Sequence, residues 1–464
     1  MNKSTTLVRI GGPVLALLVG ALGQFQPHYL LLGVALWMML WWLTETVHLG
    51  ITALLPLALF PALNLGESKA VAAHYANPLV YLFFGGFVLA LALEKSRLHY
   101  RIALWILRKS GTAPKRVVLG FMLATGFLSM WISNTATSIM MLPIATSVLA
   151  VLPKEIRKTM EKPLLLSVAW AANIGGMATI IGTPPNLIFA GFLSEQLQSP
   201  IGFLEWLPIG LSVSLLLGTA AYFILTTRMV TAGKGQQMSE VTQWLAQEWD
   251  GLGKIDRAQK HTAVVFTATA LLWILRPYLS QWIPQINWSD TGIAVTSAIV
   301  LFSLYGNEGK ALLEWKDTKN LPWGILLLFG GGLALASTLQ GSYWFDWLSN
   351  GLESLTDLPL FVWLLLMAVL GVFATEMLSN MALVSSLLPM VYSLSLVLGQ
   401  SFSTLSLPLV LGASCAFMLP MATPPNAIVF STGKLSVREM AVKGLVLNVV
   451  SVVVLTLASY WIQL

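Results

Sequence analysis

Residues 117–152 read VVLGFMLATGFLSMWISNTATSIMMLPIATSVLAVL. This apolar stretch is longer than the roughly 20 residues, with a range near 17 to 25, that one straight helix needs to cross a bilayer. Ser133, Asn134, Thr135 and Thr137 interrupt it, and such side chains compete with the backbone for helix hydrogen bonds. The stretch therefore predicts two half-helices on either side of a polar break.

The composition places the whole chain in a membrane. Of its 464 residues, 56% are hydrophobic and 10% are charged, whereas an ordinary soluble chain is about one-quarter charged. A soluble core rarely grows beyond roughly 250 to 300 residues, while a bilayer buries any number of apolar helices. We therefore expect an all-α, multi-pass protein of the cell membrane with a single domain over residues 1–464. Aromatic residues near the ends of apolar runs predict interfacial belts, namely Trp41, Trp42, Trp131, Trp206 and Trp461.

Other apolar runs add detail to this prediction. Ile10–Leu22 continues into further apolar runs without an A-x-A cleavage site, so we expect it to be retained rather than removed as a signal peptide. Leu79–Leu93 and Trp323–Leu339 are short for a spanning helix. Their length favours a re-entrant hairpin at each.

Short motifs recur in the second half of the chain at a nearly constant distance of 240 to 246 residues. FGG at 84–86 returns at 329–331, SN at 133–134 returns at 379–380, LP at 142–143 returns at 388–389, and TPPN at 183–186 returns at 423–426. These collinear matches indicate an internal duplication, with approximate repeats over 30–230 and 262–464 and a polar connection over 231–261. Paired interruptions in corresponding membrane segments are typical of a transporter site.

Each TPPN motif predicts a helix that begins inside the membrane. A hydroxyl residue suits the N-cap and proline suits the first helical position. The unpaired N–H groups and the positive end of the helix dipole attract an anion without a charged side chain. A proline kink in a continuous membrane helix is the alternative, but recurrence beside the Ser-Asn breaks favours an anion site.

The triplet Ser133–Thr135 supplies donors for carboxylate oxygens and, with unwound carbonyl groups, oxygen ligands for a small cation. The alternative is hydrogen bonding between packed helices, and recurrence at Ser379-Asn380 favours a site. The repeated glycines fit either hairpin tips or close helix packing. Glu45 and Glu376 lie in apolar runs, which indicates a functional group, an interfacial position or an internal partner.

Several classes of protein lose support. A single cysteine, Cys415, permits neither an intramolecular disulfide nor a cysteine-based zinc site. The five histidines have no metal-ligand spacing and no G-x-x-x-x-G-K-[ST] phosphate loop is present, which disfavours metalloenzymes and ATP-driven transporters. The net charge of +6 arises in short basic connections, which orient membrane chains, so we expect no nucleic-acid partner.

From about Leu30 to its C-terminus the chain resembles the divalent anion:sodium symporter family, the INDY-type di- and tricarboxylate transporters. The motifs that carry the resemblance are SMWISNTAT at 129–137, IGTPPN at 181–186, LLLFGGG at 326–332, TEMLSN at 375–380 and FMLPMATPPNAIVF at 417–430. The resemblance implies two inverted repeats with re-entrant hairpins and broken helices, about eleven transmembrane helices, a homodimer and an elevator-type mechanism.

The resemblance also implies the site residues. One sodium site is similar to Ser129, Ser133, Asn134 and Gly182, and the second to Thr375, Leu378, Asn380 and Ala422, partly through backbone carbonyls. The dicarboxylate would contact Ser133, Asn134, Thr135 and Thr183 from one half and Ser379, Asn380, Thr423 and Pro424 from the other. Met381 stands where a symmetric Ser-Asn-Thr motif would place threonine, so we expect one end of the anion to meet a less polar wall.

The expected function is sodium-coupled symport of a C4-dicarboxylate such as succinate, malate or fumarate. Sodium ions would couple transport, with no organic cofactor and no enzymatic activity. Exchange of dicarboxylates or 2-oxoglutarate, and transport of citrate or sulfate, are alternatives on the same fold. An ion channel or a membrane enzyme would be a different class. Because no Lys or Arg adjoins either break, symport is favoured over exchange.

Overall fold

The computed structural model describes residues 3–196, 201–227, 229, 238–340, 342–344 and 358–462, and all regular elements in these ranges are helices. The first part of the chain contains α1 (Lys3–Leu22), α2 (Pro27–Thr44), α3 (Leu49–Thr52), α4 (Leu55–Ala62), α5 (Ser68–Tyr75), α6 (Pro78–Lys95), α7 (Leu98–Ser110), α8 (Pro114–Ser129), α9 (Asn134–Val151), α10 (Lys154–Gly176), α11 (Pro184–Gln196), α12 (Phe203–Thr226) and α13 (Ser239–Gly251). The remainder contains α14 (Arg257–Trp282), α15 (Asp290–Ser303), η1 (Asn307–Gly309), η2 (Trp315–Asn320), α16 (Trp323–Gln340), α18 (Leu360–Ala374), α19 (Asn380–Leu398), α20 (Phe402–Gly412), α21 (Pro424–Phe430) and α22 (Val437–Ile462).

The all-α prediction is confirmed, and several of these helices suit a membrane. Among the described residues, seven helical segments are long and apolar enough to cross a bilayer, and six shorter apolar helices accompany them. In a bilayer a helix satisfies its backbone hydrogen bonds internally, which is why spanning segments take this form. The expected total of about eleven transmembrane helices stays a prediction, because length and composition do not show how far the shorter apolar helices extend across the bilayer.

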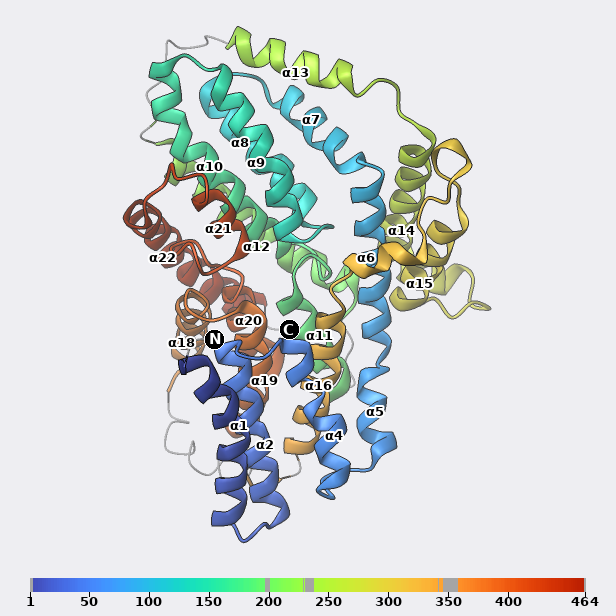
Figure 1. The fold of residues 1–464 in the computed structure, drawn as a ribbon, viewed down its shortest axis with the longest axis vertical. Coiled ribbons are helices and arrows are strands. Elements are labelled where there is room, and N and C mark those ends of the chain that lie inside the picture. Colours follow the sequence, from blue (N-terminus) through green and yellow to red (C-terminus); the bar gives the residue numbers. More distant parts are fainter. Residues whose placement is uncertain are drawn as a thin grey trace.

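The helices form two groups (Figure 1). The first group, α1–α6 with α14–α16, packs mainly on itself, and so does the second group, α8–α12 with α18–α22. Contacts between the groups come chiefly from α11 and α19 of the second against α16 and α2 of the first. The helices α7 and α13 connect the groups along the chain and contact each other at one end of the molecule.

The interrupted stretch of residues 117–152 forms two helices, as predicted. α8 ends at Ser129, and Ser133 caps α9 by accepting a hydrogen bond from the Ala136 N–H at 3.2 Å. α8 and α9 lie side by side and both pack on α10 (Figure 1). α18 and α19, which the second Ser-Asn break joins, likewise both pack on one helix, α20. Each pair therefore forms a hairpin whose tip carries the Ser-Asn break.

Re-entrant hairpins were predicted at Leu79–Leu93 and Trp323–Leu339 because these apolar runs are short, but the structure has no hairpin at either segment. Leu79–Leu93 lies within one continuous helix, α6, and Trp323–Leu339 lies within another, α16. Their glycines serve close packing instead: a Cβ on Gly85 would lie 2.6 Å from the Ala294 backbone, and one on Gly331 would lie 2.7 Å from Ala53 Cα. The prediction of hairpins at these two segments was wrong, because a short apolar run also fits a buried helix.

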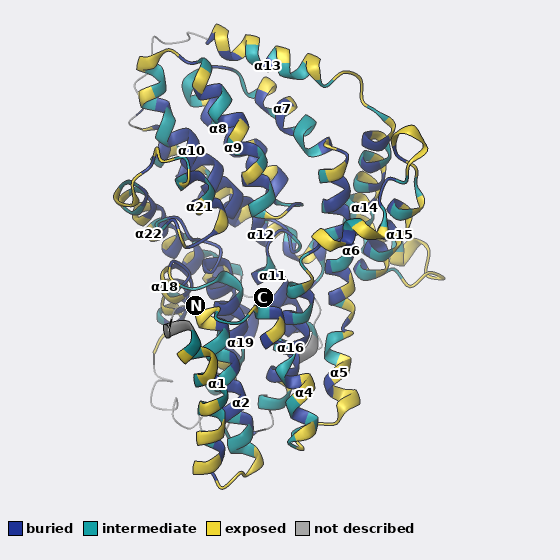
Figure 2. Ribbon diagram, viewed as in Figure 1, coloured by how far each residue is buried: buried dark blue, intermediate teal, exposed yellow. Residues whose placement is uncertain are grey.

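Two buried helices, α10 and α20, occupy the centre of the second group. Residues 163–176 of α10 are all buried, as are residues 402–412 of α20 (Figure 2). Each is followed by an unwound segment and then by the short helix that begins at TPPN, α11 or α21. α11 packs against α19 and α21 against α9, so each half of the chain completes the environment of the other half's hairpin.

The prediction that tryptophans form belts at the membrane interface fits Trp461 but not Trp42 or Trp206. Trp461 is 80% exposed, as a lipid-facing residue would be. Trp42 and Trp206 are fully buried, and their indole N–H groups donate to the carbonyls of Leu49 and Met177. These two tryptophans are core residues because partners inside the protein satisfy their single donor.

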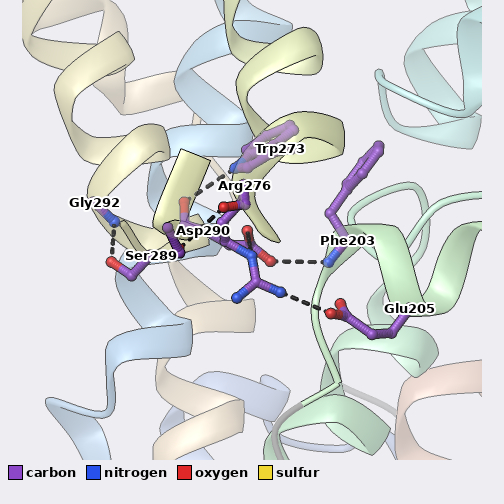
Figure 3. A network of polar contacts seen from close by, with 8 residues as sticks. Phe203, Glu205, Trp273, Arg276, Ser289, Asp290 and Gly292 are labelled. Carbon is purple, nitrogen blue, oxygen red and sulfur yellow. Dashed lines mark hydrogen bonds and ion pairs between the residues drawn. The ribbon is translucent and has the colours of Figure 1, made fainter. Parts of the chain in front are cut away.

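A polar network joins the start of α12 to the first group (Figure 3). Arg276 on α14 pairs with Glu205 of α12 and with Asp290 of α15, each at 2.8 Å. Asp290 also accepts a hydrogen bond from the Phe203 N–H at 2.9 Å. The network thus stabilises the present arrangement of the two groups at the N-terminus of α12.

Candidate functional site

A cavity of about 1080 Å³ lies where the hairpin tips meet the two TPPN segments. All eight residues predicted to bind the anion line it: Ser133, Asn134, Thr135, Thr183, Ser379, Asn380, Thr423 and Pro424. They come from α9, α11, α19 and α21 or the residue just before each, so four helix N-termini converge on one space. Such termini present unpaired N–H groups and positive partial charge, which suits an anionic ligand.

The prolines change how these helices can bind an anion. Pro184-Pro185 and Pro424-Pro425 carry no N–H group, so α11 and α21 each lose two of the donors that a helix N-terminus usually offers. α9 and α19 retain theirs and are 18 and 19 residues long. Backbone donation to an anion therefore falls mainly to the hairpin helices, and the TPPN segments contribute chiefly their threonine hydroxyls.

Among the residues described, the cavity wall contains acidic side chains but no permanently cationic one. Glu45 and Glu94 line it, as does His48, and the wall includes neither Lys nor Arg. A dicarboxylate in this cavity would therefore carry uncompensated negative charge. Helix termini supply part of the compensation, and mobile cations are the remaining source.

At the first break, three polar groups converge in a buried corner. The Ser129 hydroxyl lies 2.6 Å from Asn134 Oδ1 and 2.7 Å from the Ala172 carbonyl oxygen. A hydroxyl has one hydrogen and can donate to only one of these acceptors. A Cβ on Gly176 would lie 2.5 Å from Asn134 Oδ1, so glycine permits this close approach. The corner is an oxygen-rich site that an added cation would complete.

The second break repeats this geometry. The Thr375 hydroxyl lies 2.7 Å from Asn380 Oδ1 and 2.7 Å from the Ala413 carbonyl oxygen. Ser129 and Thr375 are both fully buried behind the cavity wall. The other predicted sodium ligands, Gly182, Leu378 and Ala422, line the cavity together with the two asparagines and Ser133. The structure thus places a matching hydroxyl–asparagine pair at each break and the other predicted sodium ligands on the wall of the same cavity.

Sodium suits these two corners chemically. Hydroxyl, amide and backbone carbonyl oxygens are the donors that broken membrane helices offer to Na⁺. A cation beside Asn134 Oδ1 and Ser129 Oγ would relieve the competition for a single hydrogen by bonding both oxygens. The same holds for Asn380 and Thr375. Each site would hold the ion as a transported species.

The asparagine of each TPPN motif holds the unwound segment in place. Asn186 Nδ2 donates to the carbonyls of Met177 and Thr179, at 3.3 and 2.9 Å. Asn426 Nδ2 donates to Ala416 and Leu419, at 3.1 and 3.0 Å. These two asparagines are fully buried and act on the backbone. Sequence reasoning treated the motif as a helix start and did not assign this role.

Glu376 is a backbone-binding carboxylate. It is 4% exposed and accepts hydrogen bonds from the N–H groups of Phe417, Met418 and Leu419 and from Asn448 Nδ2, at 2.8 to 2.9 Å. Consecutive N–H groups that surround an anion compensate its charge without a cation. Of the alternatives that the sequence left open, Glu376 has an internal partner, whereas Glu45 is exposed on the cavity wall.

Sequence reasoning missed several polar residues of the wall. Asn173 lies within a long apolar run, is 1% exposed and lines the cavity. An amide inside an apolar run was a usable signal, since polar groups at membrane depth need a partner or a function. His48 and Asn320 come from short connections, and nothing in the sequence indicates that these connections reach the cavity.

Proteins similar to this chain are membrane transporters. A family model described as the sodium:sulfate symporter transmembrane region matches residues 5–464. The sodium-dependent dicarboxylate transporter SdcS of Staphylococcus saprophyticus subsp. saprophyticus is 36% identical over 487 residues, which cover 99% of this chain and 92% of that protein. The transporter of the same name from Staphylococcus aureus strain MRSA252 is 36% identical over 472 residues, covering 97% and 90%.

Solved structures with the same overall fold come from more distant proteins. The YdaH transporter of Alcanivorax borkumensis superposes with a TM-score of 0.62 at 15% identity, over 90% of this chain and 98% of that one. Neisseria gonorrhoeae MtrF, from a class of antimetabolite efflux pumps, gives 0.58 at 13% identity, over 85% and 83%. At these identities the likeness concerns the fold alone.

Proposed function

Because the chain belongs to the family of sodium:sulfate and related divalent anion:sodium symporters, we propose that it is a sodium-coupled symporter of C4-dicarboxylates in the cell membrane. One observation carries this proposal: two matched hydroxyl–amide pairs border a cavity whose described wall contains neither Lys nor Arg. A divalent anion there needs cations, and the two oxygen-rich corners are suited to sodium. The names of the SdcS relatives supply the substrate class.

The proposed anion contacts come from both halves. Ser133, Asn134, Thr135 and Thr183 would hold one carboxylate, and Ser379, Asn380, Thr423 and Pro424 would surround the other. Asparagine amides and hydroxyls donate to carboxylate oxygens, and such charge-assisted bonds are about twice as strong as neutral ones. Met381 also lines the cavity and supplies no hydroxyl, which makes the second end less polar.

The proposed sodium ions bind behind these contacts. One would be held by Ser129, Ser133, Asn134 and Gly182, and the other by Thr375, Leu378, Asn380 and Ala422. Each asparagine belongs to both a sodium site and the anion site. Sodium binding would orient its amide, with Oδ1 toward the cation and Nδ2 toward the anion. This shared residue couples the two binding reactions, and such coupling is reciprocal.

Movement of the second group against the first would carry the site across the membrane, as an elevator. Three features support this: the proposed anion and sodium ligands lie on the second group, contacts between the groups are limited, and α7 and α13 link them. A homodimer, which the family resemblance implies, would hold the first group stationary.

Uptake by the purified protein in liposomes tests the proposal. Radiolabelled succinate should accumulate saturably under an inward sodium gradient and not under an equal potassium gradient. Citrate, sulfate and 2-oxoglutarate as competitors would rank the substrates. Uptake that requires dicarboxylate inside the liposomes, with no need for sodium, would indicate exchange and contradict symport.

A further inference from the structure

Asn173 connects the two halves of the chain at the cavity wall. It lies on α10, and its Nδ2 donates to the Ala416 carbonyl at 3.0 Å and to Thr423 Oγ1 at 3.1 Å. Ala416 and Thr423 flank the second unwound segment, about 250 residues further along the chain. Asn173 and Thr423 both line the cavity and are at most 4% exposed.

The chemistry of Ala416 fixes which way the Asn173 amide points. A backbone carbonyl oxygen can only accept a hydrogen bond, so the atom that faces it must be the amide nitrogen. The same nitrogen faces Thr423 Oγ1, which therefore accepts a hydrogen bond. The Thr423 hydroxyl does not cap α21. Its own hydrogen is left free to donate to a ligand in the cavity.

The first half lacks this arrangement. Ala172 and Ala413 accept the matching hydrogen bonds from Ser129 and Thr375, so the residue after each, Asn173 and Ser414, occupies a corresponding place. The buried Ser414 hydroxyl has no hydrogen-bond partner in the described part of the chain. No side-chain amide in the described part of the chain donates to Thr183, which corresponds to Thr423. Asn173 Oδ1 is buried and has no hydrogen-bond partner among the described residues, an arrangement that a smaller residue would avoid. The donor role at Thr423 is thus a specific feature of the second half.

We propose that Asn173 is a positioning residue that fixes the Thr423 hydroxyl as a hydrogen-bond donor to one carboxylate of the transported anion. This inference rests on the proposed function. A fixed donor favours an ionised carboxylate, which offers only acceptors, over a hydroxyl or a protonated carboxyl group. It also supplies a donor on the cavity wall to which Met381 contributes no hydroxyl.

Asn173→Asp reverses the hydrogen bond with almost no change in shape. Aspartate at 173 accepts from Thr423, so the hydroxyl would turn away and present a lone pair to the substrate. We expect the KM for succinate to rise by about tenfold or more, with sodium half-saturation near wild type. Because aspartate cannot donate to the Ala416 carbonyl, the midpoint of thermal unfolding should also fall, and it is measured alongside the KM. Asn77→Asp, at the buried N-cap of α6 and outside the cavity wall, is the matched control and should leave the KM unchanged.

A double-mutant cycle separates hydroxyl positioning from charge repulsion or misfolding. In a Thr423→Ala background, Asn173→Asp should add less than about twofold to the KM, because no hydroxyl remains to be turned. An equal rise in both backgrounds would overturn the proposal in favour of direct repulsion by aspartate. Asn173→Ala, tested in the same two backgrounds, replaces the aspartate variant if that protein does not fold.

The cycle also distinguishes this inference from the proposed function. If Thr423→Ala alone leaves sodium-dependent succinate uptake and its KM unchanged, the proposed anion site itself is wrong. If Thr423→Ala raises the KM while Asn173→Asp and Asn173→Ala do not, the anion site stands and the role of Asn173 is refuted.

Discussion

At the scale of single residues, each half of the chain builds its break from the same three parts. A buried hydroxyl, Ser129 or Thr375, faces an asparagine oxygen and a carbonyl of the adjacent central helix. The matching distances of 2.6 and 2.7 Å, at positions 246 residues apart, show that the two breaks share their chemistry as well as their Ser-Asn sequence. The two asparagines are therefore the residues at which sodium and anion binding would meet.

Loss of either asparagine amide should eliminate transport. Asn134→Ala and Asn380→Ala remove an oxygen from a sodium corner and a donor from the anion site together. We expect sodium-stimulated succinate uptake to fall at least about tenfold in each, since losing one such bond to a charged group costs about 1.5 to 3 kcal/mol. Asn287→Ala, on an exposed connection, is the control. Wild-type uptake in both variants would remove these residues from the site.

Met381 offers the opposite test, a gain of affinity. Met381→Thr restores the Ser-Asn-Thr pattern and adds a hydroxyl to the less polar end of the cavity. We expect the KM for succinate to fall by about three- to tenfold, which corresponds to one additional hydrogen bond. Met390→Thr makes the same change at an exposed position of α19 and should have no effect. A higher KM in Met381→Thr would show that the thioether itself contacts the substrate.

At the scale of elements, sequence reasoning succeeded where a polar break interrupts a long apolar run. Residues 117–152 predicted two half-helices correctly, because hydroxyl and amide groups inside an apolar run need hydrogen-bond partners or a ligand and so mark a break. The hairpins assigned to α6 and α16 were wrong, since run length cannot separate a short re-entrant segment from a buried helix. Long-range partners such as Asn448 for Glu376 could not be predicted, because they depend on packing between distant helices.

Adjacent glycines on α16 test the packing role of these motifs. A Cβ on Gly331 would lie 2.7 Å from Ala53 Cα, whereas one on Gly332 would meet nothing within 4 Å. Gly331→Ala should destabilise the protein by about 1 to 3 kcal/mol, seen as a lower midpoint of thermal unfolding in detergent. Gly332→Ala should leave the midpoint unchanged or raise it slightly, because alanine favours helix. Equal effects at the two positions would refute the packing interpretation.

At the scale of the whole molecule, the proposed anion and sodium ligands belong to one of two helix groups, while the other group supplies part of the cavity wall, including Glu45, His48 and Glu94. The second group carries both hairpins, both central helices and both TPPN helices, and it contacts the first group mainly through α11 and α19. Such an arrangement permits the second group to move as a unit. The division into repeats at 30–230 and 262–464, the dimer and the elevator movement stay predictions that flux and cross-linking can test.

A cross-link between the groups should stop transport. Gly191 on α11 approaches the Phe329 ring on α16, so Gly191→Cys with Phe329→Cys in a Cys415→Ala background places two thiols within reach of a short cross-linker. We expect uptake to stop on cross-linking and to return on reduction. Thr269→Cys with Ser297→Cys, whose native hydroxyls lie 2.6 Å apart within the first group, is the matched control. Full uptake by the cross-linked first pair would contradict movement between the groups.

The central claim is that sodium and a dicarboxylate cross together, and reciprocal flux tests it most directly. Liposomes that contain the protein would be given an inward succinate gradient with equal ²²Na⁺ on both sides, and net sodium movement would be followed. The account predicts that succinate drives sodium inward against a developing sodium gradient, and that Asn134→Ala and Asn380→Ala abolish this movement. Succinate uptake that leaves sodium undisturbed would contradict the account.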